Sequence, residues 1–254
     1  MAQFSANLGY LFTELPLADA IRASADTGFT AVEFHWPGSD STEDIKQALS
    51  ETGLPLLSIN TPRGDVKAGE FVFAAMMHRG PEARVVIGET LTLAAELGAQ
   101  NVHILAGIAD GADALDVYSE NLAFAAEVAD PLGLGILIEP LNPVDVPGYF
   151  LSNPDQAIEV IEALKDPSIG VMFDCYHIAK MGRDVIAEFH RCKPYIGHVQ
   201  FAGVPDRGPP DQGSLNYQAV FEALDAAGWD RPLGAEYRPP GETGQSLGWI
   251  NSLT

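Results

Sequence analysis

Four oxygen-bearing side chains each end a short apolar run in this sequence. The runs and their final residues are GILIE with Glu139, IGVMFD with Asp174, GHVQ with Gln200 and LGAE with Glu236. If these runs are neighbouring parallel strands of a closed barrel, their carboxyl ends meet at one mouth and the side chains converge there. Carboxylate and amide oxygens are hard ligands that suit Mg²⁺ or Mn²⁺. The sequence therefore predicts a divalent metal cation held by these four residues.

Burial is the reason to seek one explanation for all four residues. A carboxylate or amide at the end of a buried strand is costly unless it is paired or coordinated. Any one of them alone is better explained as a salt-bridged side chain, but four on consecutive predicted strands favour a shared ion. The chain has only six scattered histidines and two cysteines, which argues against a structural zinc site.

The elements that must position these residues alternate along the whole chain. Amphipathic segments of helical spacing, several of them ending at Gly, separate short apolar runs. Eight repeats of strand and helix predict an α/β fold, a (β/α)8 TIM barrel, with residues 1–254 as a single domain. The predicted strands are residues 4–11, 30–36, 54–60, 101–107, 134–140, 169–175, 196–202 and 232–238.

An open doubly wound sheet is the alternative fold. Such a sheet usually opens with a Gly-rich phosphate loop after its first strand, and LGYLFTELP stands there instead. The barrel is therefore favoured. Its two longest loops after strands, residues 61–80 and 203–213, are expected at the catalytic face as walls or lids, with a plain surface excursion as the alternative for each.

Charge excludes two classes of partner. The chain has 14 Lys and Arg against 35 Asp and Glu, a formal net charge of −21, which repels phosphate backbones and anionic lipid headgroups. We therefore expect neither nucleic acid nor membrane as a partner. Two cysteines are too few for a disulfide framework, and the N-terminal segment lacks the pattern of a secretion signal, so we expect a cytoplasmic protein.

Longer motifs resemble a known family. The stretches IEPLNPVDVPGYFLSN, FDCYH, HVQFAGVPDR and AEYRP resemble the hydroxypyruvate isomerase family of xylose-isomerase-like barrels, and GYFL is similar to members described as 2-oxotetronate isomerases. The loop NTPRGDVKAGE is similar to the family's loop after strand three, so the resemblance covers most of the chain. It implies a metal on the four strand-end residues, with Glu139 and Glu236 as the catalytic proton-transfer pair. Ser214 departs from the family, which commonly has an acidic residue there.

The chemistry that fits such a site is proton transfer between adjacent carbons of a small α-hydroxycarbonyl acid through an enediolate. One carboxylate removes a proton from one carbon, and a carboxyl group returns a proton to its neighbour. Hydroxypyruvate would give tartronate semialdehyde, and a 2-oxotetronate would give the corresponding isomer. The sequence leaves both substrates open.

Two further residues are candidates for binding the substrate. A substrate carboxylate needs a cation in so acidic a protein, and Arg207 is the first choice because a guanidinium binds a carboxylate bidentately. The alternative is that Arg207 holds its own loop through Asp206 or Asp211. His177 is a candidate for hydrogen bonding to a substrate oxygen, and a capping role at the following turn is the alternative.

His103 and Glu33 are the candidates for the floor of the substrate pocket. Each lies on a predicted strand, and each is equally well explained as a satisfied residue of the barrel interior. His198 shares its parity with Gln200, so both should point inward, with His198 one layer deeper.

Three competing functions stay open. A ketose 3-epimerase of the same superfamily would use an equivalent metal and carboxylate pair but leave the carbonyl unmoved. A phosphodiester hydrolase of the endonuclease IV type would need a His-rich cluster of zinc ions and tolerance of DNA, which this composition opposes. A non-catalytic binding barrel is the third, and whether the chain forms a homo-oligomer is also left open.

Overall fold

The strands of this protein form a closed barrel. The computed structural model describes residues 2–64, 74–76 and 79–253. Its strands follow one another around the barrel in chain order, and the registered pairs are parallel. The predicted (β/α)8 TIM barrel is therefore confirmed. The strands are β1 (Phe4–Asn7), β2 (Ala31–Phe34), β3 (Leu56–Asn60), β4 (Asn101–His103), β5 (Gly135–Ile138), β6 (Ile169–Asp174), β7 (Ile196–Phe201) and β8 (Leu233–Ala235).

Helices follow the strands as the amphipathic segments predicted. No helix of the described chain is long and apolar enough to cross a membrane. The α-helices are α1 (Leu17–Asp26), α2 (Thr42–Thr52), α3 (Gly80–Leu97), α4 (Ala112–Ala129), α5 (Pro154–Leu164), α6 (Cys175–Lys180), α7 (Val185–Cys192) and α8 (Tyr217–Ala226). Short 3₁₀ segments are η3 (Asp130–Leu132), η4 (Lys193–Tyr195), η5 (Pro210–Gln212) and η6 (Thr243–Asn251).

The sixth strand ends one residue earlier than predicted. Asp174 is its last residue and also the N-cap of α6, where its Oδ1 accepts the Tyr176 N–H at 2.8 Å. Cys175 therefore begins a helix. A capping carboxylate stops the strand because it satisfies a backbone donor that the first helical turn leaves without a partner.

The chain groups into two compact units. Unit 1 comprises Met1–Leu57, Phe173–Pro194 and His198–Thr254. Unit 2 comprises Ser58–Met172 and Tyr195–Gly197. Most of the predicted site residues belong to unit 1.

Unit 1 contains β1, β2 and β8 with the helices α1, α2 and α8, and aromatic packing joins its first strand to its last segment. Phe4 of β1 meets Trp249 of η6 edge to face, with ring centroids 4.9 Å apart, and both rings are buried. Phe201 packs on Trp249 at 5.4 Å. Because this cluster orders β1 against the end of the chain, residues at the carboxyl end of β1 have a defined position beside β8.

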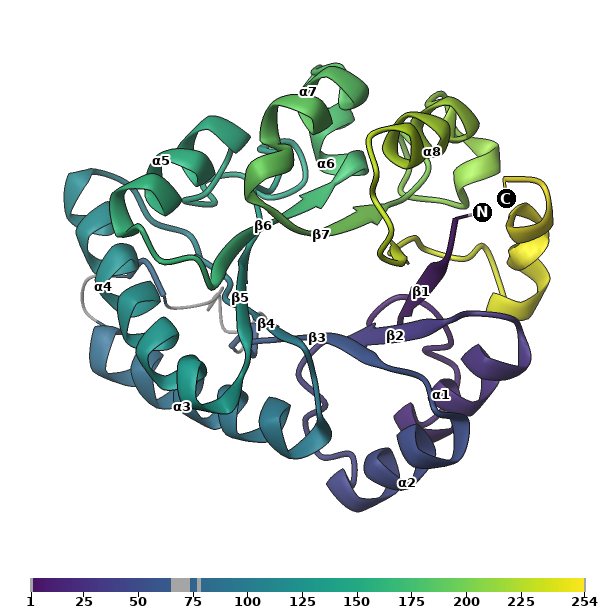
Figure 1. The fold of residues 1–254 in the computed structure, drawn as a ribbon, viewed down its shortest axis with the longest axis horizontal. Coiled ribbons are helices and arrows are strands. Elements are labelled where there is room, and N and C mark those ends of the chain that lie inside the picture. Colours follow the sequence, from purple (N-terminus) through teal and green to yellow (C-terminus); the bar gives the residue numbers. More distant parts are fainter. Residues whose placement is uncertain (1, 65–73, 77–78, 254) are drawn as a thin grey trace. The chain divides into compact units, whose positions relative to one another are not determined.

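Unit 2 contains β3, β4 and β5, with α3 and α4 on their outer side (Figure 1). Its register pairs Asn60 with His103 and His103 with Leu137. Ile138 then pairs with Val171 of β6. The register therefore sets where the chain leaves β5, and Glu139 is the next residue.

Candidate active site

The ends of β7 and β8 bring two predicted ligands to one edge of the sheet. Phe201 pairs with Ala235, and the Glu236 N–H donates to the Phe201 carbonyl at 3.0 Å. Gln200 pairs with Gly234, two residues before Glu236, so Gln200 and Glu236 lie on the same face of adjacent strands, with Glu236 one layer nearer the carboxyl edge. Parallel strands make this convergence because their carboxyl ends share one edge.

Gln200 is the most informative of the predicted ligands. Its side chain is fully buried, and neither its Oε1 nor its Nε2 has a hydrogen-bond partner among the described residues. A buried polar group without a partner costs about 1–3 kcal/mol. A divalent cation on Oε1 would remove part of that cost, so the residue fits a metal ligand.

Arg207 joins the two predicted carboxylate ligands of unit 1. Its Nη2 contacts the Glu236 carboxylate, and the same nitrogen lies 3.4 Å from Asp174 Oδ2. Its Nη1 donates to His177 Nε2 at 3.1 Å. Arg207, His177, Asp174 and Glu236 are all buried. The structure therefore brings both predicted substrate-binding residues of this unit onto the predicted ligands.

Two aromatic rings and a backbone bond hold the Arg207 guanidinium in place. It lies 4.8 Å from the centre of the Tyr10 ring and 5.0 Å from that of Tyr176. The Arg207 backbone has a positive φ of 56°, and its carbonyl accepts the Arg238 N–H at 2.7 Å. The side chain is therefore directed inward from a loop whose backbone is tied to the end of β8.

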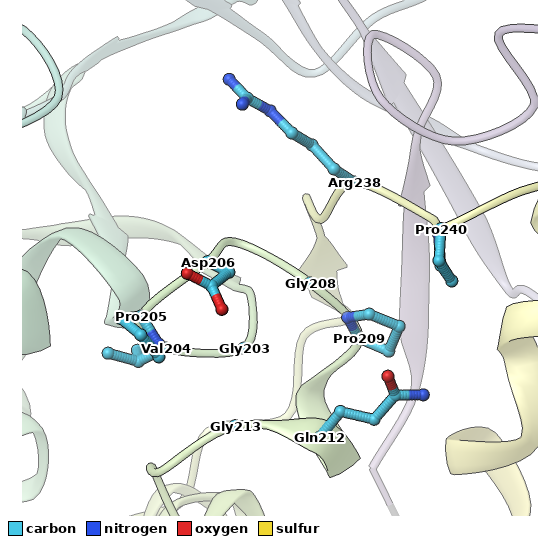
Figure 2. A pocket seen from close by; sticks show the side chains of 10 residues that line it. All are labelled: Gly203, Val204, Pro205, Asp206, Gly208, Pro209, Gln212, Gly213, Arg238 and Pro240. Carbon is cyan, nitrogen blue, oxygen red and sulfur yellow. The ribbon is translucent and has the colours of Figure 1, made fainter.

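The loop 203–213 is compact and borders a cavity, and its role as a wall or lid of the substrate pocket stays a prediction. The Gly203 N–H donates to the Gly208 carbonyl at 2.7 Å, and the Ser214 N–H donates to the Val204 carbonyl at 2.8 Å. The cavity has a volume of about 270 Å³. Figure 2 shows the residues that line it, with the Arg238 side chain extending away from Gln212. The Ser214 backbone therefore stabilises the loop conformation.

Burial and charge move the pKa values of the two unit 1 carboxylates in opposite directions. Burial raises the pKa of Asp174 to about 7, against the lowering effect of the Arg207 guanidinium. Burial also raises the pKa of Glu236, but Arg207 and then His35 outweigh it and hold that pKa at about 2. Glu236 is therefore ionised at neutral pH, as a proton acceptor must be.

Glu33 and His198 form a buried pair beneath Gln200. His198 Nε2 lies 2.6 Å from Glu33 Oε2, and both side chains are almost fully excluded from solvent. Gly234 makes room for them, because a Cβ there would overlap the Glu33 carboxylate and lie 3.0 Å from His198 Nε2. This contact favours the interior-pairing explanation for Glu33, and it agrees with the deeper position expected for His198.

Unit 2 contributes Glu139 and His103. Glu139 directly follows β5 and is 5% exposed, and its Oε2 lies 3.7 Å from His103 Nε2. His103 is fully buried. His103 ends β4, on the strand predicted for it, and its place at the floor of the substrate pocket stays a prediction.

Two partners of Glu236 were not found from the sequence. Asn7 Nδ2 donates to Glu236 Oε1 at 3.0 Å, and His35 Nε2 lies 3.8 Å from the same oxygen. Asn7 ends β1 and His35 directly follows β2, so a position at a strand end was the signal that could have identified them. The predicted lid at 61–80 lies partly outside the described residues, because residues 65–73 and 77–78 are not among them.

Comparison with known proteins agrees with this arrangement. The family model described as xylose isomerase-like TIM barrel matches residues 21–253. A 2-oxo-tetronate isomerase of Cupriavidus necator is 39% identical over 98% of each chain. A putative hydroxypyruvate isomerase of Xenopus laevis is 35% identical over 98% of this chain and 94% of that protein.

A solved structure has the same fold over its whole length. The crystal structure of a protein from Brucella melitensis titled AP endonuclease, family 2 superposes with a TM-score of 0.94. It is 34% identical and covers 99% of each chain. The chain belongs to the xylose isomerase-like TIM barrel family and is an enzyme with isomerase activity.

Proposed function

We propose that this protein is a divalent-metal-dependent isomerase of a small 2-oxo hydroxy acid, either hydroxypyruvate or a 2-oxotetronate. The observation that carries the proposal is the contact of Arg207 with Asp174, Glu236 and His177, together with the buried Gln200 amide, which has no hydrogen-bond partner in the described part of the chain. The relatives named 2-oxo-tetronate isomerase and putative hydroxypyruvate isomerase support this substrate class.

In this proposal the metal ligands are the four strand-end residues. Asp174 and Glu236 supply carboxylate oxygens, and Gln200 supplies an amide oxygen. Glu139, which directly follows β5, is the fourth ligand that we propose. The all-oxygen donors suit Mg²⁺ or Mn²⁺.

The reaction moves one proton between adjacent carbons. Bound at these ligands, the cation would polarise the substrate carbonyl and stabilise negative charge on its oxygen. Glu236 accepts the proton from the hydroxyl-bearing carbon of hydroxypyruvate, and Glu139 in its acid form donates a proton to the former carbonyl carbon. The hydroxyl proton passes to the former carbonyl oxygen, so the product, tartronate semialdehyde, has the same atoms and charge. Arg207 binds the substrate carboxylate and His177 a substrate oxygen.

The remaining predicted residues, His103 and Glu33, each contact another buried side chain. His103 contacts Glu139, and Glu33 contacts His198 below Gln200. We propose that His103 and Glu33 orient the residues that touch the substrate and border the floor of the pocket. Buried groups of this kind fix the rotamers of metal ligands.

The test is a proton NMR time course in D2O with Mn²⁺-loaded or Mg²⁺-loaded enzyme, using hydroxypyruvate and a 2-oxotetronate in turn. The proposal expects a product with a moved carbonyl, deuterium at the reacting carbons and loss of turnover on chelation. Glu236→Gln should abolish turnover, whereas Glu222→Gln, on the exposed side of α8, should leave it unchanged. An epimer with an unmoved carbonyl would replace the isomerase with a ketose 3-epimerase.

A further inference from the structure

The carboxylate of Glu236 receives a hydrogen bond from the opposite end of the chain. The donor is Asn7 at the end of β1, 229 residues away in sequence, and its Nδ2 lies 3.0 Å from Glu236 Oε1. Asn7 is 1% exposed, so water does not compete for this bond. A buried bond from an amide to a carboxylate is charge-assisted and directional.

The orientation of the Asn7 amide is set by its own turn. The Gly9 N–H donates to Asn7 Oδ1 at 2.9 Å, which makes that atom the acceptor and leaves Nδ2 to face Glu236. The Asn7 carbonyl accepts the Leu11 N–H at 2.8 Å and the Tyr10 N–H at 3.1 Å. The amide is therefore held by a folded turn, and a flipped amide would lose both side-chain bonds.

The same turn makes room for a second partner of Glu236. His35 Nε2 lies 3.8 Å from Glu236 Oε1. The His35 ring occupies the space where a Cβ on residue 9 would be, so only glycine fits there. The Tyr10 ring meets the His35 ring edge to face, with centroids 5.6 Å apart.

Tyr10 is linked to Oε2 of Glu236 through Arg207. Its ring lies 4.8 Å from the Arg207 guanidinium, which contacts Glu236 Oε2. The turn Asn7-Leu8-Gly9-Tyr10 is therefore linked to both carboxylate oxygens of Glu236. Asn7 donates to Oε1, and Tyr10 packs against Arg207, which contacts Oε2.

We infer that the Asn7–Tyr10 turn is the positioning element of Glu236, with Asn7 and His35 as positioning residues that orient Oε1. The inference deepens the proposed function, because it rests on Glu236 as ligand and proton acceptor. Asn7 and His35 act through Glu236 and not on the substrate. Loss of such an outer partner lowers metal affinity or activity by about 10- to 100-fold.

The test compares Asn7→Ala with wild type in Mn²⁺ titration calorimetry, in kcat and KM, and in thermal unfolding. Asn7→Asp is a second variant of nearly equal size that also lacks the donor. Gly9→Ala leaves Asn7 in place but displaces His35. The matched control is Asn216→Ala, which removes the side-chain N-cap of α8 away from Glu236.

If Asn7 positions Glu236, Asn7→Ala and Asn7→Asp should lower Mn²⁺ affinity or kcat by about 10- to 100-fold, with KM nearly unchanged. Gly9→Ala should have a weaker effect of the same kind. Asn216→Ala should lower thermal stability alone. The inference is overturned if Asn7→Ala keeps wild-type Mn²⁺ affinity and kcat while losing stability as Asn216→Ala does.

Failure of the proposed function is distinguishable from failure of this inference. Wild-type enzyme that binds Mn²⁺ but turns over neither acid would overturn the proposed reaction alone, and the calorimetry would still decide the role of Asn7. In a Glu236→Gln background, Asn7→Ala should change Mn²⁺ affinity no further. An equal loss in both backgrounds would mean that Asn7 does not act through Glu236.

Discussion

Glu236 and Arg207 form a buried ion pair, although they are 29 residues apart in sequence. The guanidinium contacts the Glu236 carboxylate through Nη2, and its Nε donates to the Glu236 carbonyl at 3.2 Å. The same guanidinium reaches Asp174 and His177. One guanidinium therefore contacts two buried carboxylates.

The first prediction concerns removal of that cation. Arg207→Ala should lower the free energy of unfolding of the metal-free protein by about 3–5 kcal/mol, because two buried carboxylates would lose their shared partner. Saturating Mn²⁺ should restore most of the loss. Urea unfolding with chelator and with Mn²⁺ measures both effects.

The control for this variant is Arg22→Ala, which removes an exposed ion pair with Glu51 and should change stability little. An Arg207→Ala protein as stable as wild type in chelator would mean that the guanidinium does not compensate Asp174 and Glu236.

The second prediction is a pH dependence due to Asp174. Its pKa is raised to about 7 in the folded protein from an ordinary value of 3.8, so the folded state keeps a proton that the unfolded chain releases. The stability from this group is complete below about pH 4 and is lost as pH rises through about 7, on the order of 4 kcal/mol in all. The pKa of Glu236 is lowered to about 2, so the stability that its carboxylate contributes is lost only as the pH falls toward that value.

Urea unfolding of the metal-free protein between about pH 4.5 and 8 measures this loss. Asp174→Asn should remove most of the decline, because the amide does not titrate, and so it isolates Asp174 from the other acidic groups. Mn²⁺ should reverse the slope, since the ion binds the deprotonated carboxylate. An unchanged slope in Asp174→Asn would contradict the prediction.

The third prediction separates the metal role of Gln200 from its structural role. Gln200→Leu should weaken Mn²⁺ binding by about 10-fold or more, because it removes a ligand oxygen. The metal-free variant should be as stable as wild type or more stable by about 1 kcal/mol, because a buried amide without a partner is replaced by an apolar group of similar size.

Calorimetry with Mn²⁺ and urea unfolding in chelator measure the two effects. Gln218→Leu, on the exposed side of α8, should change neither the Mn²⁺ affinity nor the stability appreciably. If Gln200→Leu kept the wild-type affinity for Mn²⁺, Gln200 would not be a ligand.

Sequence alone predicted the barrel and the polar side chains at the ends of its strands. Apolar runs of strand period recur with helical segments between them, and this periodicity is a local property that chain order converts into a parallel barrel. Gln200 and Glu236 could therefore be placed at one sheet edge before any coordinates, as the register of β7 and β8 confirms.

Tertiary structure alone decided which side chains surround those positions. Arg207 contacts Asp174 and Glu236, and Asn7 meets Glu236 across 229 residues of sequence. The choice between substrate pocket and interior pairing for Glu33 likewise needed the distance to His198. These contacts depend on loop conformations, on the positive φ of Arg207 and on the space beside Gly9, which no local periodicity encodes.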